Sequence, residues 1–257
     1  MTRVTLAFLG QCHTTGYAGV PADVAFPAVL RRVLESSRPG VSVDLVLEQF
    51  QHPSELPSAV ARALRARPRV VVIEVIGWLA IKGSGAVNLT RLPRGIRSAY
   101  DRMRHFRHVS GQLLAKAPRA SALVQTVQAD AYGIASGLLG PLLPRYPRPT
   151  IEEYEDFVNQ ALNAVAECPG MAAVVQGPAA PNLDLDLRGL ASDAVERYAA
   201  VRQMAERVAA AHSALYVDRW DTVTSGFFLP GSIRPTREGH SVFGHLLAER
   251  LLEAGLI

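Results

Sequence analysis

A cysteine and a histidine follow the first apolar stretch of the chain, and these residue types can supply a nucleophile and a proton carrier. Residues 4–9 are mostly apolar, and Gly10 separates them from Cys12, His13 and two threonines. This pattern predicts a buried strand that ends in a tight loop at the start of a helix. Helix N–H groups at such a position favour a thiolate or another anion. Cys12 is therefore a candidate nucleophile, and His13 a candidate to move protons.

The alternation of short apolar runs with helical patterns predicts the fold that positions these residues. Strands are expected at residues 4–9, 41–47, 70–76, 171–175 and 214–217, and helices at residues 26–34, 54–64, 150–166, 192–211 and 237–252. Strands that alternate with helices indicate a parallel sheet with helices on both faces. Ligands bind such sheets at the carboxyl ends of the strands, which is where Cys12 and His13 are expected. Glu74 falls inside the central strand, so it needs a partner if it is buried and is a candidate acid or base.

Composition indicates a globular protein with one core. The chain has 257 residues, of which 49% are hydrophobic and 19% charged, and this excludes a disordered chain. Its two cysteines, Cys12 and Cys168, make no disulfide framework, which fits a reducing compartment. No apolar run has the length of a transmembrane helix, and the N-terminus lacks a signal-peptide pattern. We therefore expect a cytoplasmic protein that does not act at a membrane.

Residues 79–150 depart from this regular pattern and predict a helical cap inserted over the sheet edge. Between Lys82 and Arg119 there are nine basic residues and one acidic residue. This segment is either a solvated face or a docking surface for an acidic partner, such as a phosphopantetheine carrier protein or coenzyme A. Arg97, Arg104 and Arg107 recur at helical spacing and would share one face of a helix.

Two stretches of the sequence resemble conserved blocks of the SGNH/GDSL hydrolases. Residues 10–16, GQCHTTG, align with the first block, G-D-S-x-T-x-G, and residues 231–240 align with the last block, D-x-x-H-P-T-x-x-G-H. The last block is matched at Pro235, Thr236, Gly239 and His240. The resemblance covers nearly the whole chain outside residues 79–150. It implies a single domain of residues 1–257 with a three-layer α/β/α, flavodoxin-like fold and a five-stranded parallel sheet.

The positions that carry catalysis in that family are changed here. The alignment places Cys12 at the nucleophilic serine, Gly231 at the acid and Arg234 at the histidine base. Arg234 cannot accept a proton, because a guanidinium stays protonated in proteins, but it can stabilise a thiolate. The resemblance therefore implies a site made of Cys12, His13 and Arg234. This site is either a remade thiol site or an anion-binding pocket.

Substrate contacts are expected where the other blocks of the family would fall. Residues 47–50 contain no glycine at the place of the second block, and residues 76–79 contain no asparagine at the place of the third. Both absences remove oxyanion-stabilising groups that ordinary serine-ester hydrolysis requires. The residues that we expect to contact substrate are Gln11, Gln49, His52, Gly77 and Trp78.

Two functional hypotheses stay open. The first is an SGNH-like acyl esterase, thioesterase or acyltransferase that uses Cys12 on a small or carrier-bound acyl substrate. The alternative is a non-hydrolytic protein of the same fold: a pseudoenzyme, a binding protein, or a repurposed cyclase or lyase without a catalytic triad. No cofactor is expected because the chain has no phosphate-binding glycine motif. His105 and His108 lack a third metal ligand, and no feature beyond the arginines suggests nucleic-acid binding.

Overall fold

The computed structural model describes residues 2–16, 20–82, 147–180, 193–222, 225–228 and 234–257. The chain divides into two compact units, one made of Met1–Gly83 with Arg148–Ile257 and the other of Ser84–Pro147. The sheet and its helices belong to the first unit. The cap expected at residues 79–150 falls mostly outside the described residues. The cap and the single-domain organisation therefore stay predictions.

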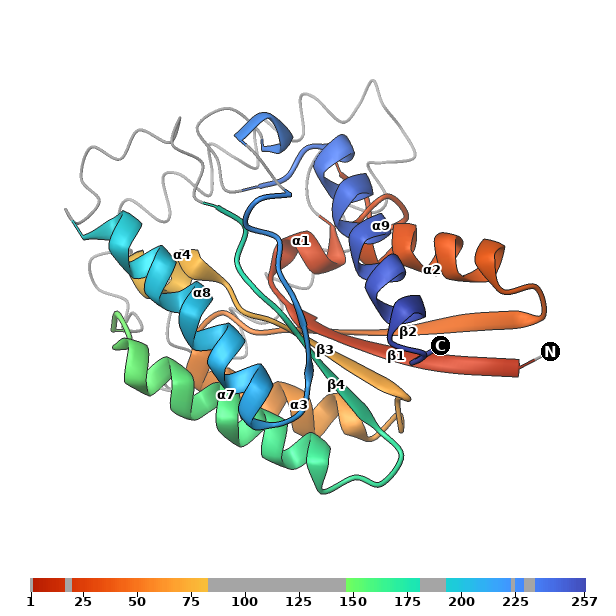
Figure 1. The fold of residues 1–257 in the computed structure, drawn as a ribbon, viewed down its shortest axis with the longest axis horizontal. Coiled ribbons are helices and arrows are strands. Elements are labelled where there is room, and N and C mark those ends of the chain that lie inside the picture. Colours follow the sequence, from red (N-terminus) through yellow and green to blue (C-terminus); the bar gives the residue numbers. More distant parts are fainter. Residues whose placement is uncertain (1, 17–19, 83–146, 181–192, 223–224, 229–233) are drawn as a thin grey trace, which may run out of the picture. The chain divides into compact units, whose positions relative to one another are not determined.

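A five-stranded parallel sheet forms the centre of the first unit (Figure 1). Its strands are β1 (Thr2–Gly10), β2 (Val41–Gln49), β3 (Val70–Glu74), β4 (Ala172–Gln176) and β5 (Leu215–Val217). They lie in the order β2-β1-β3-β4-β5, and every neighbouring pair is parallel. All five residues of β3 are buried, which explains its nearly unbroken apolar sequence. The expected sheet is confirmed.

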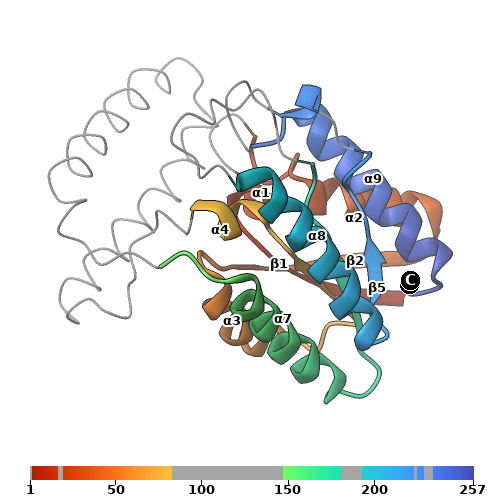
Figure 2. The same ribbon diagram turned by 60° about the vertical axis from the view of Figure 1, so that its left-hand side comes forward.

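Helices cover both faces of this sheet (Figures 1 and 2). On one face lie α2 (Phe26–Ser37) and α9 (Arg237–Glu253), and on the other lie α3 (Leu56–Leu64), α7 (Ile151–Ala166) and α8 (Ala194–Ala211). Shorter elements are α1 (Cys12–Thr15), η1 (Pro53–Glu55), α4 (Gly77–Lys82) and η4 (Ser225–Phe227). The three-layer α/β/α architecture is thus confirmed. No helix in the described part of the chain has the length and apolarity needed to cross a membrane.

The strands send alternate side chains into two separate cores. Val72 and Val174 belong to the core under α2 and α9, whereas Ile73 and Val175 belong to the core under α3, α7 and α8. Successive strand side chains point to opposite faces. The last residues of β3 and β4 therefore fall on the α2–α9 side of the sheet, at its carboxyl edge. These two residues are polar, and they begin the candidate site.

Local interactions set two of the element boundaries. A capping box is present at Thr150, with hydrogen bonds in both directions between Thr150 and Glu153 at the start of α7. The third strand was expected to reach Ile76 but ends at Glu74. The backbone N–H of Ile76 instead donates to the hydroxyl of Tyr154 at 2.8 Å, which turns the chain out of the sheet.

Candidate functional site

Four buried polar side chains gather at the carboxyl edge of the sheet. Thr14, Glu74, Gln176 and Arg219 are each 3% exposed or less. Glu74 and Gln176 are paired in register at the ends of β3 and β4, and Arg219 follows β5 by two residues. The strand order therefore brings together residues that are far apart in the sequence, at the edge where parallel sheets bind ligands.

An ion pair between Glu74 and Arg219 forms the centre of this cluster. Arg219 Nη1 donates to Glu74 Oε1 at 2.7 Å, and Arg219 Nε donates to the carbonyl oxygen of Gly177 at 2.7 Å. The second carboxylate oxygen, Glu74 Oε2, accepts a hydrogen bond from Thr14 Oγ1 at 3.2 Å. The guanidinium carbon of Arg219 also lies 4.8 Å from the centre of the Phe243 ring. Buried charges need such pairing, because desolvating either one alone costs several kcal/mol.

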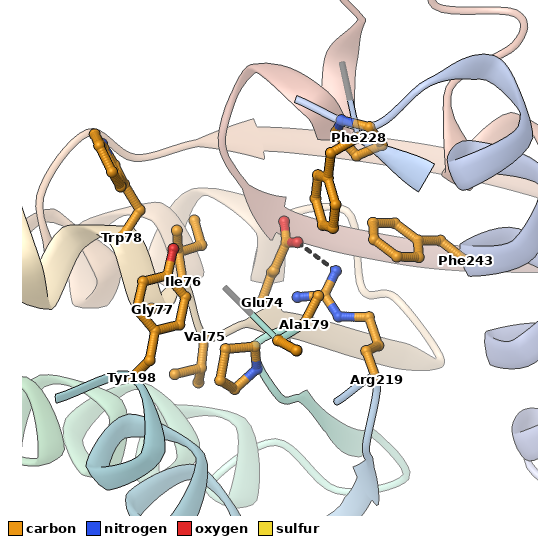
Figure 3. Close-up of a pocket in the computed structure, with 13 residues that line it drawn as sticks. Glu74, Val75, Ile76, Gly77, Trp78, Ala179, Tyr198, Arg219, Phe228 and Phe243 are labelled. Carbon is orange, nitrogen blue, oxygen red and sulfur yellow. Dashed lines mark hydrogen bonds and ion pairs between the residues drawn. The ribbon is translucent and has the colours of Figure 1, made fainter. Parts of the chain in front are cut away.

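The ion pair lines a cavity of about 60 Å³, large enough for several water molecules or a small part of a ligand. Figure 3 shows Glu74 and Arg219 at the middle of the lining, with Trp78 and Tyr198 on one side and Phe228 and Phe243 on the other. The remaining lining residues are small or apolar: Val75, Ile76, Gly77, Pro178, Ala179, Ala180 and Pro235. The lining resembles that of a small-molecule site, mostly apolar with a few convergent polar groups, but the volume is well below the roughly 300–1,000 Å³ of a pocket for a drug-sized ligand.

Cys12 is the first residue of α1, which directly follows β1 and the N-cap residue Gln11. The side chains of Cys12 and His13 lie outside the described residues, so their catalytic roles stay predictions. The helix expected here is only four residues long. So short a helix contributes little of the charge stabilisation expected from a helix N-terminus.

The residues on either side of Cys12 connect it to the ion pair. Thr14 hydrogen-bonds to Glu74. The backbone of Gly10 lies close to both of these side chains, because a Cβ atom built on Gly10 would be 2.5 Å from Glu74 Oε2 and 2.0 Å from Thr14 Oγ1. Glycine is therefore required at position 10 for this close approach. The backbone that carries Cys12 is thus fixed against the carboxylate that lines the cavity.

Arg234 is exposed and precedes Pro235, which forms an isolated antiparallel bridge with Phe228. Both bridge partners line the cavity, so Arg234 belongs to the segment that borders it. The acid position of the family, Gly231, lies outside the described residues. The pairing of Arg234 with Cys12 remains a prediction.

The five expected substrate-contacting residues fall in two places. Gly77 and Trp78 line the cavity. Gln11, Gln49 and His52 are not among its described lining residues. The Gln49 side chain donates to Thr15 Oγ1, and His52 is buried with its Nδ1 2.8 Å from Ser54 Oγ, where it caps η1. Substrate contact by any of the five is still a prediction.

His240 has a packing role in the structure. It is fully buried in the first turn of α9, and its Nδ1 accepts a hydrogen bond from the backbone N–H of Phe26 at 3.1 Å. Its ring also stacks on the Phe26 ring. This contact ties the start of α9 to the start of α2, which is a structural role.

Several cavity residues were not identified from the sequence, chiefly Arg219, Tyr198, Phe228 and Phe243. One signal for Arg219 did exist, because a buried Glu74 requires a cation and Arg219 follows a strand at the same edge. Burial raises the pKa of Tyr198 above its ordinary value, so its hydroxyl remains a neutral phenol near pH 7.

The described residues hold no cluster of three or more metal-binding side chains, and His105 and His108 lie outside them.

Comparison with known proteins identifies the fold through solved structures. No protein-family model matches the sequence, and no curated protein matches it. A lipase/acylhydrolase from Enterococcus faecalis superposes with a TM-score of 0.58 at 13% identity, covering 98% of this chain and 96% of that one. A carbohydrate acetylesterase from Sinorhizobium meliloti gives a TM-score of 0.56 at 12% identity, covering 98% and 99%. A protein assigned to the G-D-S-L lipolytic family, from Desulfitobacterium hafniense DCB-2, gives 0.54 at 14% identity, covering 96% and 99%.

These structures define the class of fold. The chain has the SGNH/GDSL-hydrolase fold, as the two sequence blocks predicted. At 12–14% identity the similarity concerns the fold and carries no information about the substrate.

Proposed function

We propose that the protein transfers acyl groups, with Cys12 as the nucleophile and the cavity beside Glu74 and Arg219 as the acyl-binding site. The observation that carries this proposal is the contact of Gly10 and Thr14, on either side of Cys12, with the carboxylate that lines the cavity. Cys12 also occupies the position of the family's nucleophile in the first sequence block.

The proposed reaction has two steps. The Cys12 thiolate adds to the acyl carbon of an ester or thioester, a new C–S bond forms, and the bond to the leaving alcohol or thiol breaks. The leaving group takes its proton from His13 or from solvent. Water or an acceptor alcohol or thiol then attacks the S-acyl intermediate, loses a proton, and releases Cys12 as the thiolate.

A cysteine suits the changed site better than a serine would. A serine hydroxyl needs a base in hydrogen-bond reach, whereas a thiol needs only a lowered pKa. The family's base position holds Arg234, which cannot accept a proton but can favour a thiolate. This difference is the reason to expect thioester chemistry in place of ordinary serine-ester hydrolysis.

A second candidate function is non-covalent binding, or a rearrangement without an acyl-enzyme. The feature that favours it is the state of Glu74, the one carboxylate in the described lining of the cavity. Both of its oxygens accept hydrogen bonds, from Arg219 and from Thr14. A carboxylate held in this way stabilises a fixed site better than it removes protons from a substrate.

An acidic carrier is a further part of the proposal. Arg97, Arg104 and Arg107 belong to the strongly basic segment between Lys82 and Arg119. A phosphopantetheine carrier or coenzyme A would present phosphate groups to these side chains.

Turnover of thioesters tests the proposed function directly. We expect the protein to hydrolyse one or more acyl thioesters of N-acetylcysteamine, from a series that runs from acetyl to octanoyl and benzoyl. Cys12→Ala should lower kcat/KM roughly 1,000-fold or more, and Cys168→Ala, the matched control, should leave it unchanged. Turnover should be insensitive to serine-directed phosphonates, because the proposed nucleophile is a thiol. Full turnover by Cys12→Ala, or no turnover of any thioester, would favour the second candidate.

A further inference from the structure

Among the described residues that line the cavity, the two charged side chains balance each other, and this limits what the cavity can bind. Arg219 supplies one positive charge, and Glu74 supplies one negative charge at 2.7 Å. Both side chains are 4% exposed or less, so water screens them poorly. A carboxylate or phosphate entering the cavity would place a second negative charge beside Glu74. An uncharged ligand group avoids that cost.

Arg219 has hydrogen-bond donors beyond those used by its partners. A guanidinium carries five N–H groups, and two of them are engaged, one at Nε with Gly177 and one at Nη1 with Glu74. Within the part of the chain that the structure describes, Nη2 donates to no residue. Arg219 is among the residues that line the cavity. Its position is fixed by the two bonds that it already makes.

Gln176 provides a second, independent sign that a polar partner is missing at this edge. It lies in register between Glu74 on β3 and Val217 on β5, and it is fully buried. Neither its Oε1 nor its Nε2 atom has a hydrogen-bond partner among the described residues. Burying such groups unpaired is unfavourable, so buried amides normally bond to protein, water or ligand.

The side chains that wall the cavity indicate which kind of chemical group would carry the acceptor oxygen. Trp78, Tyr198, Phe228 and Phe243 present aromatic surface around the ion pair (Figure 3). Aromatic walls bind flat or apolar bodies and leave orientation to the few polar groups between them.

We infer that this cavity recognises an uncharged carbonyl group on an apolar or aromatic body, with Arg219 donating to the carbonyl oxygen and Glu74 holding Arg219 and excluding anions. The inference deepens the proposed function, on which it rests for the identity of the carbonyl as an acyl group. In that setting Arg219 supplies a donor where the oxyanion-stabilising glycine and asparagine of the family blocks are absent. Recognition itself needs no covalent step, so it can be tested apart from Cys12.

The test uses a matched pair of fluorinated probes, 4-fluorobenzamide and 4-fluorobenzoate, which differ chiefly in charge. Their dissociation constants are measured by ¹⁹F NMR with the full-length protein near pH 7.5. The wild type should bind the amide about tenfold or more tightly than the carboxylate. Glu74→Gln keeps an acceptor for Arg219 but removes the negative charge, so it should reverse this preference in favour of 4-fluorobenzoate.

A charge-free control separates recognition from folding. The double variant Glu74→Leu/Arg219→Met removes both charges together, a change that buried ion pairs often tolerate. It should stay folded by circular dichroism and should bind the amide about tenfold more weakly. Equal affinities for the two probes in the wild type, or undiminished amide binding in the folded double variant, would overturn the inference. Amide binding without any thioester turnover would refute acyl transfer but leave the inference standing.

Discussion

Arg219 Nη1 lies 2.7 Å from Glu74 Oε1, and this ion pair spans the carboxyl edge of the sheet from β3 to the segment after β5. Between the two lies β4, which ends at Gln176, whose side-chain amide has no hydrogen-bond partner among the described residues. The hydrogen bond of Thr14 to Glu74 extends the connection to α1, which begins at Cys12. One buried pair therefore lines the cavity at the end of the sheet and contacts the short helix that begins at Cys12.

Gly10→Ala should destabilise the protein and disturb the site. Its Cβ would lie 2.0 Å from Thr14 Oγ1 and 2.5 Å from Glu74 Oε2, so the Thr14–Glu74 contact must shift. We expect a loss of about 1–3 kcal/mol in the free energy of unfolding, measured by urea denaturation, and a fall in thioester turnover. Gly226→Ala is the control, because a Cβ there meets nothing within 4 Å. Equal free energies of unfolding for the two variants would contradict the close contact of Gly10 with Thr14 and Glu74.

The buried phenol of Tyr198 predicts a loss of stability at alkaline pH. Burial raises its pKa in the folded protein above the unfolded value near 10, so its contribution is complete below about pH 10 and is lost as pH rises further. Above that pH the wild type should lose about 1.4 kcal/mol per pH unit more than Tyr198→Phe, because the variant cannot ionise there. Urea denaturation at several pH values between about 8 and about 11 measures this difference. Parallel curves for the two proteins would mean that Tyr198 is not buried.

His240→Leu tests the structural role of a histidine that the family pattern shares. The substitution leaves the buried N–H of Phe26 without its acceptor, which should cost about 1–3 kcal/mol in the free energy of unfolding. Thioester turnover, measured well below the melting temperature, should change by no more than a few-fold. A loss of turnover as large as that of Cys12→Ala, with stability unchanged, would instead place His240 in the chemistry.

The basic segment predicts a salt dependence that is specific to phosphorylated substrates. Arg97→Glu combined with Arg104→Glu should lower kcat/KM for an acyl-coenzyme A and leave the value for the same acyl group on N-acetylcysteamine unchanged. Raising the salt concentration from about 50 mM to about 500 mM should lower kcat/KM only for the reaction of the wild type with the acyl-coenzyme A. Identical salt profiles for the wild type and the double variant would show that these arginines form only a solvated surface.

The sequence predicted the sheet well because each strand of the fold is a short apolar run between helical patterns. β3 and β4 were expected within about two residues of their observed ends, and the misplaced end of β3 reflects one hydrogen bond, from Ile76 to the Tyr154 hydroxyl. That bond joins residues 78 positions apart, so no local pattern could indicate it.

The candidate site was predicted less completely, because it depends on strand order. Glu74 was expected to need a partner if buried, but Arg219 lies 145 residues away and meets it only because β5 lies beside β4 at the same edge. Gly77 and Trp78 line the cavity because they directly follow the central strand, and their contact with substrate stays a prediction. The aromatic walls from α8, α9 and the segment at Phe228 carry no sequence signal beyond ordinary core residues.

The most direct measurement of the central claim is the mass of the protein during its first turnover. The protein is mixed with the benzoyl thioester of N-acetylcysteamine, quenched in acid before one turnover is complete, and analysed intact and after digestion. We predict a mass increase of one benzoyl group, on the peptide that carries Cys12, in the wild type and in Cys168→Ala but not in Cys12→Ala. Turnover without an adduct on Cys12, or an adduct on Cys168 alone, would contradict acyl transfer through Cys12.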